Sequence, residues 1–201
     1  MKRILFATAA LIAFSATNAE AQQQQRYQEG SMSPLTGFYL GGTAGYVNGD
    51  GGGLGSDDYD GGDYGVFAGY KVDHILNRTV NQMGIGLNGA IEAHYIWSDA
   101  ESDAIEKDTE WGISFRPGFS VLDEVTPFGL NPYGIIGYRR AEFETATDTD
   151  DHNGFELGIG TEVLAYNNIG LRVDYAHTWY DEKNDYDPTE HTVRAGLAYH
   201  F

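Results

Sequence analysis

The sequence predicts an all-β fold, an eight-stranded antiparallel up-and-down transmembrane β-barrel, and three observations carry this prediction. Eight segments alternate apolar and polar side chains, which is the pattern of strands whose two faces meet different surroundings. Turn-forming or acidic stretches separate these segments. Glycine and tyrosine are abundant, at 27 and 14 residues, whereas proline is rare at 5, a balance that favours closely packed strands.

The N-terminus predicts export from the cytoplasm. Two basic residues, a short apolar run and the small-x-small pattern Ala19-Glu20-Ala21 follow one another, in the order of a secretory signal peptide. The alternative, an N-terminal membrane anchor, would need an apolar run of about 18 to 20 residues. We therefore expect a signal peptide at 1–21, cleaved after Ala21, then a flexible periplasmic tail at 22–35 and a barrel domain at 36–201.

The alternating segments have the length that a tilted strand needs to cross a bilayer, about 9 to 11 residues. The clearest is 85–97, where Leu87 and Ile91 share one face and Glu92 lies on the other. The eight segments are 37–47, 63–72, 85–97, 111–121, 132–142, 155–163, 169–179 and 191–201.

Most acidic residues fall between these segments rather than within them. Acidic stretches alternate along the chain with shorter turn signals. In an up-and-down barrel, successive connections lie at opposite ends, so the acidic stretches would share one end and the turns the other. Because outer-membrane barrels keep their periplasmic turns short, the acidic stretches are predicted to be long extracellular loops. The acidic loops are 50–63, 99–110, 142–151 and 181–190, and the periplasmic turns are 73–84, 122–131 and 166–168.

The strands of a water-soluble β-sandwich also alternate apolar and polar side chains. Two details favour a membrane barrel over a sandwich. Aromatic residues such as Tyr95, Trp111 and Trp179 stand where the apolar faces end, as in the interfacial girdles of membrane barrels. Full charges occupy the middle of the opposite face, at Glu92 and Arg172 among others. Inside a closed barrel these charges can pair, and closure leaves no unpaired strand edge in lipid.

Composition and motifs exclude several other classes of function. The net charge of −18 would repel a nucleic-acid backbone. The Gly-Gly-x-Gly-x-Asp pattern at 52–57 is a single copy of a calcium repeat that binds only in stacks. A partial EF-hand loop beginning at Asp148 lacks the glycine and glutamate that such a loop requires. The six histidines show no metal-ligand spacing, so we expect no metal ion and no cofactor.

One histidine raises the question of catalysis. His177 lies on the predicted outward face between Tyr175 and Trp179, and some barrel enzymes carry serine and histidine on their outer wall. No serine lies near His177 on the same face, and Thr178 is predicted to point inward. The sequence therefore predicts that the protein is not an enzyme.

Both ends of the predicted barrel resemble a known family. The stretch Gly-Phe-Tyr-Leu-Gly-Gly-Thr-Ala-Gly-Tyr at 37–46 resembles the first strand of the OmpA-type transmembrane domain. It resembles still more the small outer-membrane proteins of alphaproteobacteria, the Omp25/Omp31-like group. The ending Ala-Gly-Leu-Ala-Tyr-His-Phe at 195–201 resembles the C-terminal signal of this class. The resemblance implies location in a Gram-negative outer membrane, transit with periplasmic chaperones, and recognition of Tyr199 and Phe201 by the barrel assembly machinery.

The resemblance also implies an interior salt-bridge cluster, which it aligns with Glu92, Arg116, Glu162 and Arg172. Physical reasoning agrees, because acids and bases in a narrow lumen lose hydration and should pair. The network is predicted to extend to His94, Arg139, Asp174 and Arg194. Side chains just fill the interior of an eight-stranded barrel, so the cluster is expected to plug the lumen. The alternative is that the pairs exchange partners and gate a narrow ion path.

The sequence therefore predicts a structural outer-membrane protein, a monomer that packs against lipid and lipopolysaccharide and contributes to envelope integrity. Two alternatives stay open. The first is a surface binding protein or adhesin that acts through the acidic extracellular loops. The second is a narrow ion-conducting pore.

Overall fold

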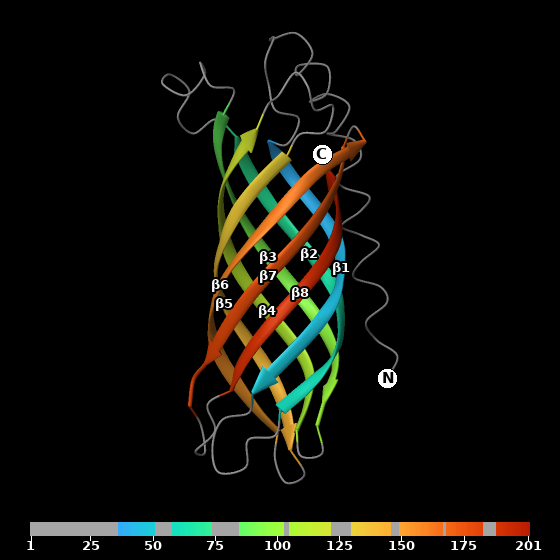
Figure 1. Ribbon diagram of the computed structural model, residues 1–201, viewed down its shortest axis with the longest axis vertical. Helices are drawn as coiled ribbons and strands as arrows, with labels where there is room; N and C mark the ends of the chain where they lie inside the picture. Colours follow the sequence, from blue (N-terminus) through green and yellow to red (C-terminus); the bar gives the residue numbers. More distant parts are fainter. Residues whose placement is uncertain are drawn as a thin grey trace. The chain divides into compact units, whose positions relative to one another are not determined.

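Eight strands form a closed antiparallel barrel in which each strand pairs with its sequence neighbours and β8 returns to pair with β1 (Figure 1). This computed structural model describes residues 36–50, 58–73, 85–102, 105–121, 130–145, 149–166, 168–182 and 188–201. The strands are β1 (Gly37–Asp50), β2 (Asp58–Asp73), β3 (Ile85–Glu101), β4 (Ile105–Val121), β5 (Leu130–Thr145), β6 (Thr149–Tyr166), β7 (Ile169–Tyr180) and β8 (Thr189–His200). Within these ranges no helix is long and apolar enough to span a membrane. The predicted fold class is confirmed.

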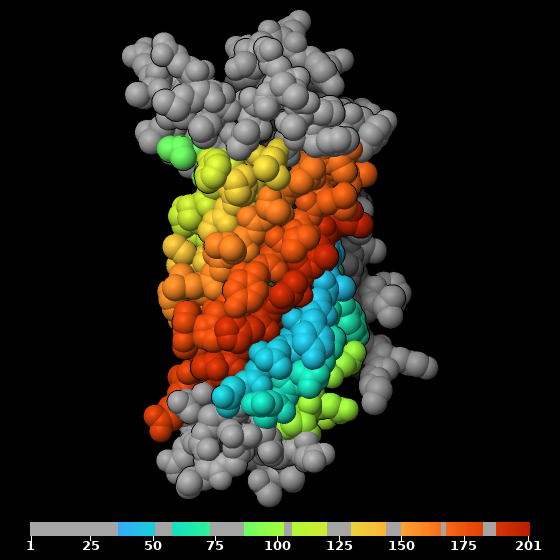
Figure 2. Space-filling model, in the orientation of Figure 1, coloured from blue at the N-terminus to red at the C-terminus, as the bar shows by residue number. Residues whose placement is uncertain are grey.

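The seam between the first and last strands closes the sheet on itself. β1 and β8 are antiparallel, with paired residues running from Tyr39 and His200 to Asp50 and Thr189. Figure 2 shows the two strands side by side, blue against red, crossing the barrel wall obliquely. A closed barrel has no edge strand, so the sheet presents no row of unpaired backbone N–H and C=O groups.

Most strands are longer than the sequence predicted, and they take up much of three of the four acidic stretches, 50–63, 99–110 and 142–151. β5 continues to Thr145 and β6 begins at Thr149, so the prediction of a loop at 142–151 is wrong over most of its length. Acids fit the strand geometry because they alternate with inward residues. Asp99 and Glu101, for example, are exposed while Ala100 between them is buried.

The lengths of the connections differ from the expectation at the end with the acidic stretches. One end of the barrel carries the segments 51–57, 102–104, 146–148 and 181–188, and the other carries 74–84, 122–129 and 167–168. The longest segment, 74–84, is therefore at the end where short turns were predicted. The predicted turns at 73–84, 122–131 and 166–168 agree with the connections at their end to within two residues. The predicted acidic loops are longer than the connections at the other end, because the strands extend through most of the acidic residues.

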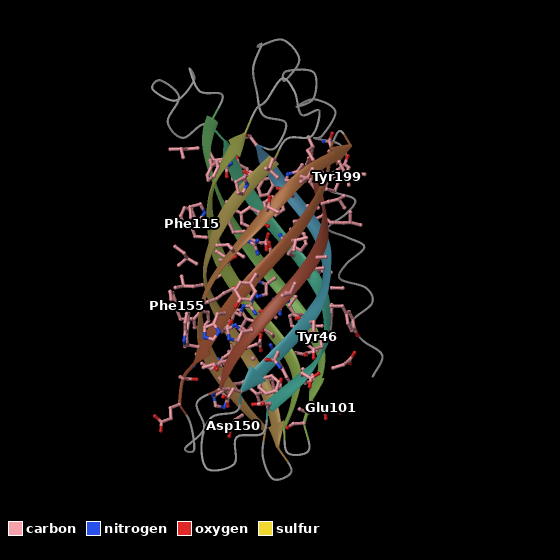
Figure 3. The ribbon with its side chains drawn as sticks, in the orientation of Figure 1. Tyr46, Glu101, Phe115, Asp150, Phe155 and Tyr199 are labelled. Atoms are coloured by element: carbon pink, nitrogen blue, oxygen red, sulfur yellow. The ribbon has the colours of Figure 1, made fainter. Side chains whose placement is uncertain are left out.

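Apolar side chains cover the middle of the outer wall. Ile91 on β3 and Ile159 on β6 are 59% and 67% exposed, and Figure 3 shows Phe115 and Phe155 projecting away from the barrel. Every strand contributes exposed aliphatic residues to this apolar belt, among them Leu40, Val66, Ile91, Ile113, Ile136, Leu157, Leu171 and Val193. So wide an apolar surface is unusual for a protein surrounded by water.

Aromatic rings border the apolar belt and touch one another across strands. Toward the end with the acidic stretches, Tyr64 stacks on Trp97 with 5.7 Å between ring centroids. Toward the other end, Phe38 meets Tyr70 at 4.8 Å. Beyond the first of these bands the outward side chains become acidic, as at Asp60, Asp99, Glu101 and Glu106. An apolar belt between two aromatic bands is typical of a membrane-spanning barrel.

The inward side chains make up the core, and most of them are polar or charged. Apolar residues form two small clusters among them, one around Phe143 and one around Phe67. The lumen is therefore where the chemistry of the fold is concentrated.

Candidate functional site

The carboxylate of Glu92 on β3 is at the centre of the first interior cluster. Its Oε1 lies 2.8 Å from Nη2 of Arg116 on β4, and its Oε2 lies 2.6 Å from Nη1 of Arg172 on β7. Asp174 joins both arginines, with Oδ2 2.9 Å from Nη1 of Arg116 and 3.3 Å from Nη2 of Arg172. We call these four residues the Glu92 cluster. Two acids and two bases thus satisfy each other in a space that excludes most water.

Aromatic residues pack around the Glu92 cluster and complete its hydrogen bonds. The hydroxyl of Tyr39 donates to Oε2 of Glu92 at 2.9 Å, and the hydroxyl of Tyr133 donates to Asp174. The guanidinium of Arg172 lies over the ring of Phe67, 3.5 Å from its centroid. A buried ion pair is stable only when its remaining polar atoms are also satisfied, and these neighbours help to meet that condition.

Glu162 has other partners than the sequence predicted. Its Oε2 lies 3.5 Å from Nζ of Lys71, and its Oε1 lies 2.7 Å from Nε2 of His200. Glu162 is the register partner of Arg172 in the β6–β7 ladder, but the Arg172 guanidinium extends across the lumen toward β3. The predicted grouping of Glu162 with the other three residues is therefore corrected, and Glu162 forms a group with Lys71 and His200.

A second and larger cluster surrounds Glu110 on β4. Its carboxylate lies 2.7 Å from Nζ of Lys107, 2.9 Å from Nη1 of Arg139 and 3.3 Å from Nη2 of Arg194. Each cation also reaches another acid, at 2.5 to 2.6 Å. The Glu110 cluster consists of Asp63, His94, Lys107, Glu110, Arg139, Glu156, Arg194 and Glu190.

The predicted extension of the network divides between the two clusters. Asp174 belongs to the Glu92 cluster, whereas Arg139 and Arg194 belong to the Glu110 cluster. His94 also lies in the second cluster, with Nε2 3.4 Å from Oε1 of Glu110. All four are inward-facing, but they do not form one continuous network around Glu92.

Sequence reasoning missed several members of these clusters. It assigned Asp63, Glu110 and Glu190 to extracellular loops, whereas all three side chains are buried in the lumen at 3% exposure or less. Glu110 and Glu190 immediately precede the predicted strands 111–121 and 191–201, so extending the alternation by one step would have placed them inside. Asp63 was both the last residue of the predicted loop 50–63 and the first of the predicted strand 63–72. Runs of acidic residues were instead interpreted by composition alone.

The charges inside the barrel nearly balance. Among the described residues the buried acids are Asp63, Glu92, Glu110, Glu156, Glu162, Asp174 and Glu190, and the buried lysines and arginines are Lys71, Lys107, Arg116, Arg139, Arg172 and Arg194. Seven carboxylates therefore face six permanent cations. The described lumen thus contributes only about one negative charge to the net charge of −18 for the whole chain.

An apolar cluster lies next to the Glu110 cluster inside the barrel. Phe143 is its centre, with ring centroids 5.8 Å from Tyr59 and 5.5 Å from Tyr180. The hydroxyl of Tyr180 donates to Oε2 of Glu110 at 3.2 Å, which joins the apolar residues to the ion pairs. We call Val47, Tyr59, Ala100, Ala141, Phe143 and Tyr180 the Phe143 cluster. It adds a layer without charge to the filling of the lumen.

Two small cavities lie among the described side chains of the lumen. One cavity of about 20 Å³ lies between the Glu92 and Glu110 clusters, and another of about 20 Å³ lies between Glu92 and Glu162. Each has room for about one water molecule. Arg139 and Glu156 line the first cavity, and Nε of Arg139 and Oε2 of Glu156 have no hydrogen-bond partner among the described residues. A bound water in this cavity would satisfy them.

Comparison with known proteins assigns the family. The model of the outer membrane protein beta-barrel domain matches residues 6–201. The chain belongs to this family. A 22 kDa outer membrane protein of Rhizobium leguminosarum bv. viciae is 33% identical over 168 residues, which cover 80% of this chain and 72% of the relative. A 25 kDa outer-membrane immunogenic protein of Brucella melitensis biotype 1 is 29% identical over 214 residues, which cover 98% of this chain and 92% of the relative.

A solved structure shares the fold. The crystal structure of Neisserial surface protein A matches with a TM-score of 0.57 at 17% identity, covering 83% of this chain and 99% of that chain. With the family established, this outer membrane protein beta-barrel is a small barrel of the alphaproteobacterial type, located in the outer membrane. The apolar belt with its two aromatic bands is therefore the surface that meets lipid.

The remaining predicted residues lie outside the lumen or outside the described ranges. Tyr199 is exposed on the outer wall, and Phe201 follows β8 directly in the sequence. The predicted signal peptide at 1–21, the tail at 22–35 and the calcium-repeat pattern at 52–57 lie outside the described residues, as does Asp148. His177 faces outward, where its ring lies 4.2 Å from the rings of Trp179 and His191.

Proposed function

We propose that this outer-membrane barrel is a structural component of the envelope, closed by its own side chains, which contributes to envelope integrity as a monomer packed in lipid and lipopolysaccharide. The ion pairs that cross the lumen are the observation that carries the proposal. In a ring of eight strands, β3 lies opposite β7 and β4 lies opposite β8. The Glu92–Arg172 pair joins the first two of these walls, and the Lys107–Glu190 pair joins the other two.

Bridges between opposite walls support a plug because they occupy the full width of the lumen. Hydrophobic packing at the Phe143 cluster adds a second kind of barrier, which no ion can cross without losing its hydration. The wall needs no second chain for closure, since β8 pairs with β1 of the same chain. This supports a monomer.

A narrow ion-conducting pore is the less favoured alternative. Conduction would require several pairs to separate together, because Glu92, Glu110 and Arg139 each hold more than one partner. Breaking one buried pair costs about 3 to 5 kcal/mol. Exchange of partners within a cluster would lower this cost, but the two cavities beside Glu92 each have room for only about one water.

A second candidate function, surface binding, is favoured by the acidic rim. Beyond the aromatic band near segments 51–57 and 181–188, the exposed outward acids include Asp58, Asp60, Asp99, Glu101, Glu106, Asp108, Asp151 and Glu182. Of the lysines and arginines in the described ranges, Arg140 alone lies outside the lumen, and it pairs with Asp151 at 2.5 Å. Such a rim would attract a cationic partner. The Brucella relative is named as immunogenic, which is consistent with a surface that reaches the cell exterior.

The proposal includes no enzymatic activity. His177 is the residue that invited a catalytic interpretation, and its ring contacts in the described structure are with His191 and Trp179. Neither is the serine or threonine nucleophile that hydrolysis with a histidine base requires.

Deletion and complementation test the proposal and separate it from surface binding. Deleting the gene should sensitise cells to detergent and to large antibiotics, and the wild-type protein should restore resistance. The matched rim variant Asp99→Asn/Glu101→Gln/Glu106→Gln should restore resistance equally, because it leaves the lumen and the belt intact. Unchanged resistance in the deletion strain would contradict the structural function. Failure of the folded rim variant to restore resistance would favour the binding function instead.

A further inference from the structure

Two histidines face each other on the outer wall. His177 on β7 and His191 on β8 are directly paired across the ladder, and their ring centroids are 4.2 Å apart. Their Nδ1 atoms lie 3.3 Å from each other. No other outward cross-strand pair of the described residues brings two imidazoles together, and neither side chain takes part in the lumen clusters.

The separation of the two nitrogens fits the ligand spacing of a single metal ion. Zinc–imidazole bonds of 2.0 to 2.1 Å at a tetrahedral angle place two ligand nitrogens about 3.3 Å apart. Square-planar geometry at copper would bring them closer, to about 2.9 Å by the same arithmetic. We propose that His177 and His191 form an exterior binding site for a divalent transition-metal ion such as Zn²⁺, held through their two Nδ1 atoms.

The surroundings hold both rings in place for this role. The ring of Trp179 meets His177 edge-on, with an interplanar angle of 82°. The ring of Tyr175 stacks on His191. Its hydroxyl lies at hydrogen-bond distance, 2.8 Å, from Nδ1 of His191, so the hydroxyl must turn away from this nitrogen when a metal ion binds there. Because both rings are fixed by neighbours and by the strand pairing, little side-chain entropy is lost when a metal ion binds.

The site is open rather than enclosed. His191 is exposed, and within the described ranges no group of three or more histidine and acidic residues converges to complete a closed site. Two histidines would therefore anchor the ion, and water would fill its other positions. Along the β7–β8 ladder, the next outward pair on one side is Trp179 with Thr189, and the next on the other side is Tyr175 with Val193. The histidine pair therefore lies at the level of the aromatic band.

A simpler alternative is a hydrogen bond between two neutral rings. A neutral imidazole carries one N–H and one lone pair, so the 3.3 Å separation can hold a shared proton in place of a metal ion. Both arrangements point the same two nitrogens at each other. The metal site and the hydrogen bond differ in one measurable respect. Only the metal site predicts that removing either histidine weakens the binding of an ion.

Zinc titration of the refolded barrel in detergent micelles tests the site. Isothermal calorimetry should give a Zn²⁺ site that His177→Gln and His191→Gln each weaken at least tenfold. The matched control His74→Gln removes a histidine outside the described residues and should bind as the wild type does. The heat-modifiable gel shift of each variant checks that it has folded.

Three results would overturn the proposal. The first is a wild-type barrel that binds no Zn²⁺ with a Kd below about 1 mM, a free energy of about −4.1 kcal/mol. The second is binding that persists at wild-type affinity in both folded variants, which would assign it to other groups such as the acidic rim. The third is a loss of binding in the control His74→Gln while His177→Gln and His191→Gln still bind.

Discussion

The carboxylate of Glu92 lies between the guanidinium groups of Arg116 and Arg172, at 2.8 and 2.6 Å. Through this one side chain, β3 is joined both to its neighbour β4 and to β7 on the opposite wall. The arrangement explains how a chain with a strongly acidic surface keeps a nearly neutral interior. It also makes the stability of the barrel depend on groups that never meet lipid.

The Glu92–Arg172 contact should appear as an energetic coupling. Removing one partner leaves a buried charge and should lower the free energy of unfolding by about 3 to 5 kcal/mol, less any relief from lumen water. Glu92→Ala/Arg172→Ala should cost less than the sum of the two single substitutions. Urea unfolding in micelles should give a coupling energy above about 0.5 kcal/mol.

The matched control for this cycle is Glu110 with Arg172. Glu110 is equally buried but holds Lys107, Arg139 and Arg194 as its partners. Its coupling to Arg172 should therefore be smaller than that of Glu92. Equal coupling energies in the two cycles would mean that the charged groups of the lumen interact non-specifically rather than as defined pairs.

Charge on the outer wall should cost more in the middle of the belt than beyond its aromatic border. Ile91→Arg puts a cation among lipid tails and should lower the free energy of unfolding by about 2 to 4 kcal/mol. Asp99→Arg on the same strand lies beyond Trp97 and should cost about 0 to 1 kcal/mol. Refolding into lipid vesicles with urea titration measures both. Equal costs would show that the belt has been placed wrongly along β3.

The end of the barrel with segments 51–57, 102–104, 146–148 and 181–188 should face the cell exterior. The reason is that β1 begins and β8 ends at the other end of the barrel. The C-terminal signal there is expected to meet the assembly machinery in the periplasm. An epitope tag inserted after Asn184 should bind antibody on intact cells. The same tag after Thr126 should bind only after the outer membrane is opened, and the reverse pattern would invert the topology.

The strand pattern could be predicted from sequence because alternation is a local property. The outward positions of Ile91, Phe155 and Val193 follow from side-chain parity within each segment, and parity also placed Glu92 and Arg116 inside. The boundaries were predicted less well. Acidic composition at 99–110 and 142–151 suggested loops, although alternating acids are compatible with a strand that emerges from the membrane.

The contacts in the lumen could not be predicted in the same way. Lys107 lies inside because the β4–β5 register shifts between Lys107 and Thr109, and a β-bulge of this kind reverses the parity of the residues beyond it. The choice of Lys71 and His200 as partners of Glu162 depends on how far each side chain extends across the lumen. The pairing of His177 with His191 depends on the β7–β8 register. None of these is encoded in spacing along the chain.

Conductance of the purified wild-type barrel in a planar lipid bilayer tests the central claim most directly. A lumen filled by the Glu92, Glu110 and Phe143 clusters should give no stable unitary current, while a general porin measured in the same bilayers gives clear steps. Folding and insertion are checked by the heat-modifiable gel shift of the same sample. Reproducible unitary steps from the folded wild-type barrel would contradict the plug and establish the narrow pore instead.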